Sequence, residues 1–324
     1  MTCYSPLEAW YAKEVNESGK RSLVFNQRYA EQPDQPINIS CGQCWGCRLE
    51  RSRQWAVRCM HEASMHENNC FITLTFSPEG LTRRNAEFRK EEKENPDRVK
   101  GWNEVGIHPR DFQLFMKRLR KKFGKGVRYY YCGEYGEINN RPHYHACMFN
   151  FDLPDRKLWK MSNGIPLYRS EILEELWPYG YSTIGEVTFE SAAYVARYVM
   201  KKVNGEQAKE QGTYVRHNSE TGEASFVKPE YCAMSRRPGI GKTWFEKYKE
   251  DVYPNDFVIL RGKKARPPKY YDKLLEADDT FTYDEIKMAR IENAYKWVDE
   301  QTPERLKAKE KCKIKQTEKL VRNL

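Results

Sequence analysis

Two stretches on either side of an asparagine pair decide the fold: Val127-Arg-Tyr-Tyr-Tyr-Cys-Gly-Glu-Tyr135 and His143-Tyr-His-Ala-Cys-Met-Phe149. Both are rich in aromatic residues, which favour strands, and the connection between them contains Asn139-Asn140. Asparagine tolerates the positive φ of tight turns, so the pair predicts a β-hairpin. Side chains alternate between the two faces of a strand, so His143 and His145 share one face and the tyrosine between them points to the other.

The hairpin also predicts which residue lies opposite the histidines. Residue 134 pairs with residue 143 or 145, and either register puts Glu134 on the histidines' face. Two imidazoles and one carboxylate form a three-ligand set with open positions, as a catalytic metal requires. Mn²⁺, Mg²⁺ and Zn²⁺ all accept such ligands. Glu137 is a weaker alternative ligand, since its parity places it on the opposite strand face, and two ordinary strand histidines are the plain alternative.

Apolar patterns predict the elements on either side of the hairpin. The apolar face of the first helix consists of Phe112, Phe115, Met116, Leu119 and Phe123. Thr188 is the predicted N-cap of the second helix. The elements are a buried strand over Cys70–Phe76, a helix over Pro109–Gly124, a strand over Tyr181–Val187 and a helix over Phe189–Val203. This order predicts an α+β domain with an antiparallel sheet over residues 65–205.

The rest of the chain is predicted as extensions of this domain. Residues 1–64 form a cysteine-containing extension, irregular up to about residue 40 and then helical over Arg48–His66. Ser77-Pro-Glu-Gly80 reads as a turn that closes the first strand, and residues 81–107 read as an exposed insertion because they are densely charged. Residues 206–324 form a polar extension that ends in an exposed charged helix.

Two tyrosines, Tyr194 and Tyr198, lie four residues apart in the last helix of the domain and therefore share one helical face. The spacing alone is common in a chain with 21 tyrosines, and core packing is the plain interpretation. Lys201 and Lys202 follow one turn later. A phenol has a pKa near ~10, so a nucleophilic tyrosine needs nearby positive charge or a metal. A tyrosine helix beside a metal site would attack a phosphodiester.

Composition favours a polyanionic partner. Lysine and arginine total 56 against 46 acidic residues, which gives a net charge of +10, and the pI is near 9.0. Such a balance favours nucleic acid, because cations over phosphates release condensed counterions. Candidate phosphate contacts are Arg118, Lys121, Lys122 and Lys202. No secretory signal or apolar run of membrane-spanning length is visible, so we expect a cytosolic protein with reduced thiols and no membrane partner.

The cysteines predict a second metal site. Cys41, Cys44 and Cys47 are spaced as CxxCxxC, one ligand short of a tetrahedral structural zinc site. Cys3 or Cys59 could complete the set. A redox pair, simple buried thiols and an iron–sulfur cluster are the alternatives.

Three segments, in this order, resemble the motifs of the HUH endonucleases: Phe71-Ile-Thr-Leu-Thr-Phe76, Arg141-Pro-His-Tyr-His145 and Tyr194-Val-Ala-Arg-Tyr-Val-Met-Lys-Lys202. The paired tyrosines resemble those of initiators from small single-stranded DNA phages. The segment from Cys41 to Cys59 and the segment Ser235-Arg-Arg-Pro-Gly-Ile-Gly241 are similar to the replication initiators of gokushovirus-type Microviridae. The resemblance covers about residues 41–245.

The resemblance implies a rolling-circle replication initiator with a central antiparallel sheet of about five strands. His143, His145 and Glu134 would then hold Mg²⁺ or Mn²⁺, Tyr194 and Tyr198 would be nucleophiles, and Lys201 would assist. The expected partner is single-stranded origin DNA in the cytoplasm of a bacterial host. Because Gly239-Ile-Gly-Lys-Thr243 lacks the first glycine of a phosphate loop, we expect unwinding by a host helicase, with a host polymerase. A plasmid initiator, a transposase and a non-catalytic, zinc-stabilised nucleic-acid-binding protein are the alternatives.

Overall fold

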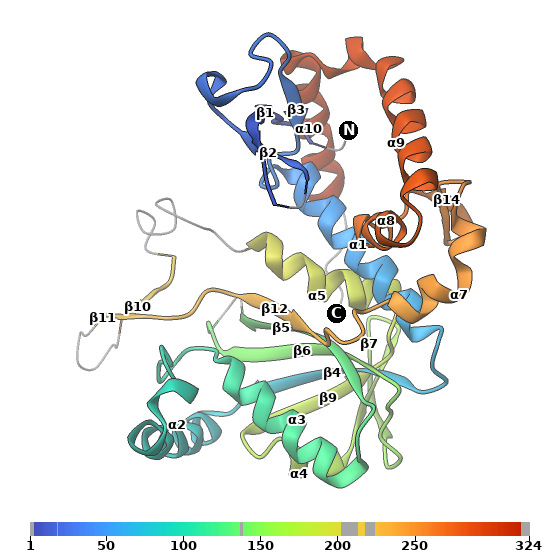
Figure 1. The fold of residues 1–324 in the computed structure, drawn as a ribbon. Helices are drawn as coiled ribbons and strands as arrows, with labels where there is room; N and C mark the ends of the chain where they lie inside the picture. Colours follow the sequence, from blue (N-terminus) through green and yellow to red (C-terminus); the bar gives the residue numbers. More distant parts are fainter. Residues whose placement is uncertain (1–2, 18, 137–138, 202–212, 218–223, 319–324) are drawn as a thin grey trace. The chain divides into compact units, whose positions relative to one another are not determined.

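A computed structural model describes residues 3–17, 19–136, 139–201, 213–217 and 224–318 (Figure 1). The chain divides into two compact units. The first combines residues 1–51 with 279–322, and the second is built mainly from residues 52–278. The predicted 65–205 domain lies inside the second unit.

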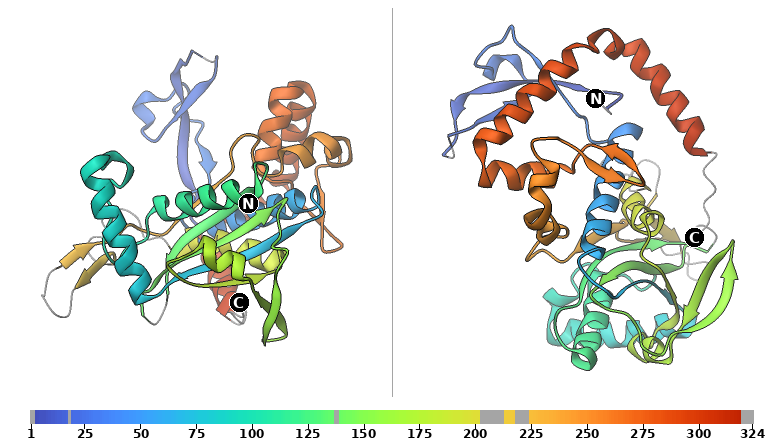
Figure 2. Two further views of the ribbon diagram at one scale, coloured as in Figure 1. Left: turned by 90° about the horizontal axis from the view of Figure 1, so that it is seen from below. Right: turned by 90° about the vertical axis from the view of Figure 1, so that its right-hand side faces the viewer.

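The second unit is built on an antiparallel sheet in the strand order β12-β5-β6-β4-β9-β8-β7 (Figure 1). The described residues thus contribute seven strands, and the α+β class is confirmed, but the expected number of about five strands was too low. The β7–β8 hairpin, which forms one edge of the sheet (Figure 2), has mostly exposed side chains without a clear alternation. The strands are β4 (Asn69–Phe76), β5 (Arg128–Tyr135), β6 (Pro142–Phe149), β7 (Lys157–Ser162), β8 (Ile165–Arg169), β9 (Gly180–Gly185) and β12 (Tyr231–Met234).

Helices cover both faces of this sheet (Figure 1). One face carries α3 (Pro109–Phe123) and α4 (Glu171–Leu176), and its core contains Phe112, Phe115, Met116 and Leu119, as predicted. The other face carries α1 (Trp45–Ala63) and α5 (Phe189–Lys201), which bury small side chains against it. Those small residues are Ala56, Cys59, Ala192, Val195 and Ala196. Because alternate residues of each strand enter different cores, the two faces are chemically distinct.

Residues 78–107 differ from the sequence prediction. Ser77 caps the N-terminus of a helix, α2 (Pro78–Glu94), with Pro78 in its first turn, so the apparent turn is a helix start. The segment is also not simply exposed, because Arg84 and Phe88 are buried. The Arg84 guanidinium donates to the carbonyl oxygens of Gly106 (3.2 Å) and Glu104 (3.0 Å). A buried arginine that binds backbone carbonyls looks like an ordinary surface charge in the sequence.

The first unit contains a sheet where the sequence predicted irregular chain. Its strands, in the order β2-β1-β3, are β1 (Leu7–Val15), β2 (Arg21–Val24) and β3 (Ile37–Ile39). Their side chains are mostly exposed, which removes the alternation that would have revealed them. The predicted charged helix at the end of the chain is confirmed as α9 (Thr280–Tyr295) and α10 (Pro303–Glu318). Among the described helices, none is long and apolar enough to cross a membrane.

Candidate metal centre and tyrosine helix

The hairpin of β5 and β6 positions the three predicted metal ligands. Its register pairs Glu134 with His143 and Cys132 with His145, in agreement with the parity argument. Asn140 has a φ of +46°, the left-handed conformation expected of the connection. Glu137 lies outside the described residues. The three side chains therefore project from adjacent strands onto the face that α5 covers.

The ligand atoms converge on one point. Oε1 of Glu134 lies 2.6 Å from Nε2 of His143 and 2.8 Å from Nε2 of His145. Glu134 is 1% exposed, and His145 is 8% exposed. One oxygen and two imidazole nitrogens thus meet in a nearly dry site, with donor chemistry that fits a divalent cation.

Both imidazole rings are fixed by a contact at the other nitrogen. Nδ1 of His143 lies 2.9 Å from the carbonyl oxygen of Arg141, so it donates a proton there and leaves Nε2 as the free lone pair. Nδ1 of His145 lies 2.9 Å from the hydroxyl of Thr73 on β4. Metal-binding histidines commonly have such a partner, which orients the ring and selects its tautomer. The sequence prediction missed the role of Thr73, because the register of β4 against β6 is a tertiary feature.

The carboxylate of Glu134 is kept ionised. Burial would raise its pKa, but the hydrogen bonds from His143 and His145 outweigh this effect and hold the pKa below its ordinary value. Its second oxygen, Oε2, is buried and has no hydrogen-bond partner among the described residues. A buried carboxylate oxygen without a donor is costly in a folded protein, and a cation at this point would satisfy it.

The helix α5 brings Tyr194 to the same point. Thr188 caps this helix as predicted, because its hydroxyl accepts from the backbone N–H of Ser191 (3.1 Å). The half-buried Tyr194 ring packs edge-on against His145, with ring centroids 5.0 Å apart and planes at 89°. Two side chains fasten the backbone on either side of it. Ser52 donates to the carbonyl oxygen of Ala193 (3.1 Å), and Cys232 donates to that of Val195 (3.3 Å).

Tyr198 and Lys201 continue this helix, so the predicted four-residue spacing falls on a helical backbone. Their side chains lie outside the described part of the structure, as does Lys202 altogether. Their positions relative to His143 and His145 therefore stay predictions.

The basic residues of α3 lie on the opposite face of the sheet from the histidines (Figure 1). The half-buried Arg118 donates to the carbonyl oxygen of Leu176 (2.9 Å), and its guanidinium lies over the ring of Tyr179. Lys122 pairs with Glu175 at 2.7 Å, and Lys121 is exposed. The structure therefore does not bring these predicted DNA contacts to the tyrosine helix, and Arg118 has a clear structural role.

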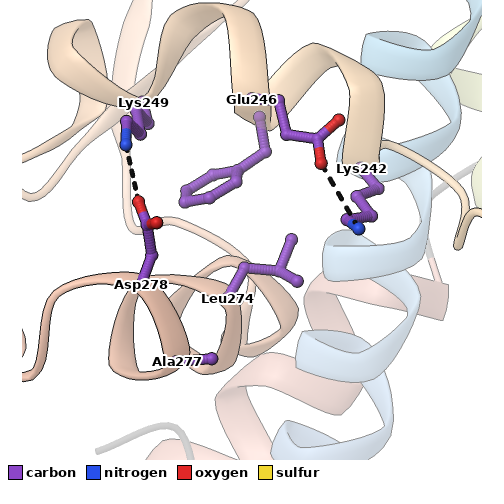
Figure 3. Close-up of a pocket in the computed structure, with 7 residues that line it drawn as sticks. Lys242, Glu246, Lys249, Leu274, Ala277 and Asp278 are labelled. Atoms are coloured by element: carbon purple, nitrogen blue, oxygen red, sulfur yellow. Dashed lines mark hydrogen bonds and ion pairs between the residues drawn. The ribbon is translucent and has the colours of Figure 1, made fainter.

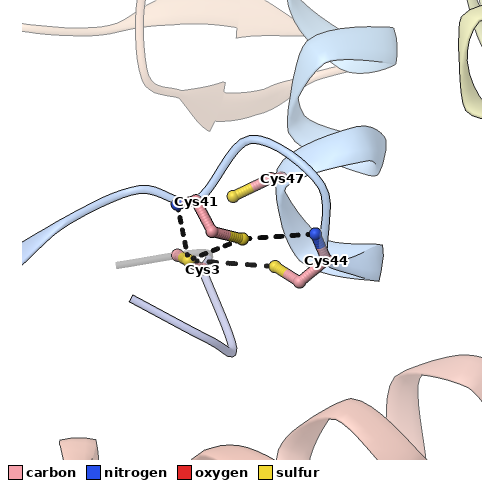
Figure 4. A group of neighbouring side chains, drawn as sticks. All are labelled: Cys3, Cys41, Cys44 and Cys47. Atoms are coloured by element: carbon pink, nitrogen blue, oxygen red, sulfur yellow. Dashed lines mark hydrogen bonds between the residues drawn. The ribbon is translucent and has the colours of Figure 1, made fainter. Parts of the chain in front are cut away.

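The cysteine set is completed by Cys3 rather than by Cys59. The sulfur atoms of Cys3, Cys41, Cys44 and Cys47 all lie within 4.8 Å of one another (Figure 4). Cys59 is fully buried and packs in the core beneath α1 and α5. The sequence could not decide between them, because Cys3 reaches the others only through the fold.

A hollow between α7 (Lys242–Val252) and α8 (Lys269–Asp278) contains none of the predicted site residues (Figure 3). Apolar side chains of Phe245, Leu274 and Ala277 line it. Ion pairs close its rim, Lys242 with Glu246 at 3.3 Å and Lys249 with Asp278 at 2.5 Å. The hollow offers no group suited to nucleophilic chemistry.

The chain is similar to proteins of small phages. The profile of a family described as replication-associated protein ORF2 matches residues 69–203, from the start of β4 to just beyond α5. The chain is 33% identical over 309 residues to replication-associated protein ORF2 of Spiroplasma virus 4, covering 90% of this chain and 86% of that protein. It is 31% identical over 281 residues to replication-associated protein VP4 of Bdellovibrio phage phiMH2K, covering 84% and 76%. Replication-associated protein ORF4 of Chlamydia phage 1 is 26% identical over 246 residues, covering 73% and 53%. No solved structure matches the chain.

Proposed function

The chain belongs to the family of phage replication-associated proteins, and from this premise we propose that it is an HUH-type nickase that starts rolling-circle DNA replication. Its substrate would be single-stranded origin DNA, and its product a strand joined covalently to a tyrosine. One observation carries the proposal: Glu134, His143 and His145 converge on a single point, and the ring of Tyr194 packs against His145.

Glu134, His143 and His145 would hold a divalent cation, Mg²⁺ or Mn²⁺, which supplies Lewis-acid polarisation of the scissile phosphate when bound. The protein's own contribution is position and charge. Thr73 and the Arg141 carbonyl hold the two rings with Nε2 directed inward. The contacts from Ser52 and Cys232 fix the backbone beside Tyr194, so that the phenol approaches from one direction.

The reaction is a transesterification. The phenolic oxygen of Tyr194 or Tyr198 attacks phosphorus, a P–O bond to tyrosine forms, and the P–O3′ bond breaks. The leaving 3′ oxygen takes a proton, and the tyrosine loses one. The 5′-phosphotyrosine keeps the energy of the phosphodiester, so a later 3′-hydroxyl attacks it and rejoins the strand without an external energy source. The second tyrosine would accept the next strand, with Lys201 offsetting negative charge.

The partners follow from this role. Single-stranded DNA is the substrate, and the net charge of +10 favours its binding at low salt. A host helicase would unwind the duplex, and a host polymerase would extend the free 3′-hydroxyl. These partners place the activity in the cytoplasm of the bacterial host.

The test is a nicking reaction on single-stranded phage origin DNA with Mn²⁺ or Mg²⁺, resolved on a denaturing gel that detects protein–DNA adducts. The unmodified protein is compared with Tyr194→Phe, Tyr198→Phe and the double variant. We expect a metal-dependent adduct that the double variant lacks, and the single variants rank the two nucleophiles.

Tyr295→Phe is the matched control, because Tyr295 is an exposed tyrosine of α9. It should form the adduct as the unmodified protein does. DNA binding without an adduct under any metal condition would contradict the nickase and support the non-catalytic binding protein. An adduct that survives in the double variant would remove these two tyrosines from the mechanism.

A further inference from the structure

Four cysteine sulfurs of the first unit form a compact group that the proposed nickase does not use (Figure 4). Sγ of Cys3 lies 3.6 Å from Sγ of Cys41 and 3.8 Å from Sγ of Cys44. A tetrahedral zinc ion with Zn–S bonds of ~2.3 Å holds its sulfurs about 3.8 Å apart. These two sulfur separations thus match a four-thiolate zinc site.

The backbone around the group is arranged for negatively charged sulfur. The N–H of Tyr4 donates to Sγ of Cys44 at 3.2 Å. Sγ of Cys41 accepts from the N–H groups of Gln43 (3.4 Å) and Cys44 (3.3 Å), and Sγ of Cys3 accepts from that of Cys41 (3.3 Å). Amide donors directed at sulfur stabilise thiolate over thiol. A thiol cluster that only filled space would not need four such donors.

The position of the four cysteines suggests what such a site stabilises. Cys3 precedes β1, Cys41 follows β3, and Cys47 lies in the first turn of α1. A metal there would therefore join both ends of the small sheet to the start of a helix. The first unit has little else to hold it, because its described buried apolar side chains are few: Cys3, Ala9, Ala30, Ile286 and Leu306. Small units with a poor core commonly depend on a metal or disulfides.

We propose that Cys3, Cys41, Cys44 and Cys47 bind one zinc ion as four thiolates, in a structural site that fastens the three-stranded N-terminal sheet to the start of α1. The site is separate from Glu134, His143 and His145 in sequence and in ligand type. It holds four protein ligands and leaves no open position, so its role is structural rather than catalytic. A four-iron cluster fits less well, because its own iron and sulfide atoms would hold the cysteine sulfurs farther apart.

The test is metal analysis of the purified full-length protein after gel filtration in EDTA, which strips weakly held cations. We expect one zinc per chain, released when a mercurial reagent modifies the cysteines. Cys3→Ser should lower zinc affinity at least about tenfold, since it removes one of four ligands. Cys312→Ser is the matched control, because Cys312 is exposed on α10. Glu134→Gln should also keep its zinc, which separates this site from the nickase centre.

Cobalt substitution of the unmodified protein gives the same answer without a variant, should Cys3→Ser fail to fold. Four thiolates produce intense d–d bands in the red, typical of tetrahedral cobalt, together with thiolate charge-transfer absorption. The proposal is overturned by bound iron in place of zinc, by a disulfide among these cysteines in the freshly isolated protein, or by zinc that Cys3→Ser retains with full affinity. Loss of nicking with zinc still bound would contradict the proposed function and leave this site standing.

Discussion

The hydroxyl of Thr73 lies 2.9 Å from Nδ1 of His145, across the pairing of β4 with β6 that places these two residues opposite each other. The contact leaves Nε2 of the same ring directed at Glu134, 2.8 Å away. Thr73 therefore acts as a positioning residue, which orients a metal ligand without being one.

Replacing Thr73 with valine should weaken metal binding while the fold persists. Valine keeps the branched shape that suits a strand and removes only the hydroxyl. Loss of an orienting partner of a metal-binding histidine typically costs 10- to 100-fold in metal affinity, and we expect a loss of about that size. Calorimetric titration with Mn²⁺ measures it. Thr73→Ser restores the hydroxyl and should recover most of the affinity, and equal losses in both variants would contradict the assignment.

Glu134→Gln should lower Mn²⁺ affinity more than Thr73→Val does. The substitution keeps the shape of the side chain but removes the charge on the single oxygen that faces both histidines. Neutral amide oxygens are weaker ligands than carboxylates for a hard cation, so we expect at least about a tenfold loss. Glu230→Gln is the control, because that residue accepts from Tyr214 at 2.8 Å and belongs to another contact. Unchanged Mn²⁺ affinity in Glu134→Gln would exclude Glu134 as a ligand.

Tyr144→Phe should destabilise the protein and leave the metal site intact. The fully buried Tyr144 lies between the two histidines in sequence but points into the other core. Its hydroxyl donates to the buried carboxylate of Asp111 (2.6 Å) and accepts from the N–H of His108 (2.9 Å). Leaving these buried groups without a partner should cost about 1–3 kcal/mol of unfolding free energy. Urea unfolding measures this loss, and a parallel fall in Mn²⁺ affinity would contradict the separation of the two faces.

The sequence predicted the hairpin, its register and the convergence of Glu134 with the two histidines, because strand alternation and a short connection are local properties. It also predicted α3 and α5 with their caps, since their apolar faces are continuous. The same reasoning failed for α2, where a proline in the first helical turn resembles a turn signal, and for β1–β3, whose side chains are mostly exposed.

The missing parts of the site depend on tertiary contacts. Thr73 reaches His145 from a strand that is distant in sequence, and Ser52 reaches the carbonyl oxygen of Ala193 from another helix. Cys3 joins Cys41, Cys44 and Cys47 only after the N-terminal sheet has formed. No spacing rule connects residues so far apart, so the sequence left Cys3 and Cys59 as equal choices.

Stability should fall in mild acid because two histidines are buried without charge. Burial lowers the pKa of His61 to about 4, and that of His108 to about 4. His61 stacks on Trp244, with ring centroids 3.5 Å apart, and its Nδ1 lies 2.8 Å from the hydroxyl of Tyr271. In the unfolded chain a histidine titrates near ~6.5. Below that pH the unfolded state binds a proton that the folded state does not, so stability present above about pH 6.5 is lost progressively down to about pH 4.

His61→Phe isolates this effect, because phenylalanine keeps a ring in the stack and cannot titrate. We expect the unfolding free energy of the variant to fall less steeply between about pH 6 and pH 4, by up to about 1.4 kcal/mol per pH unit. At neutral pH the variant should be about 1 kcal/mol less stable, since Tyr271 loses its partner. Urea unfolding at a series of pH values measures both. Carboxylates titrate equally in the two proteins and cancel in the difference, so identical slopes would show that His61 is protonated in the folded state.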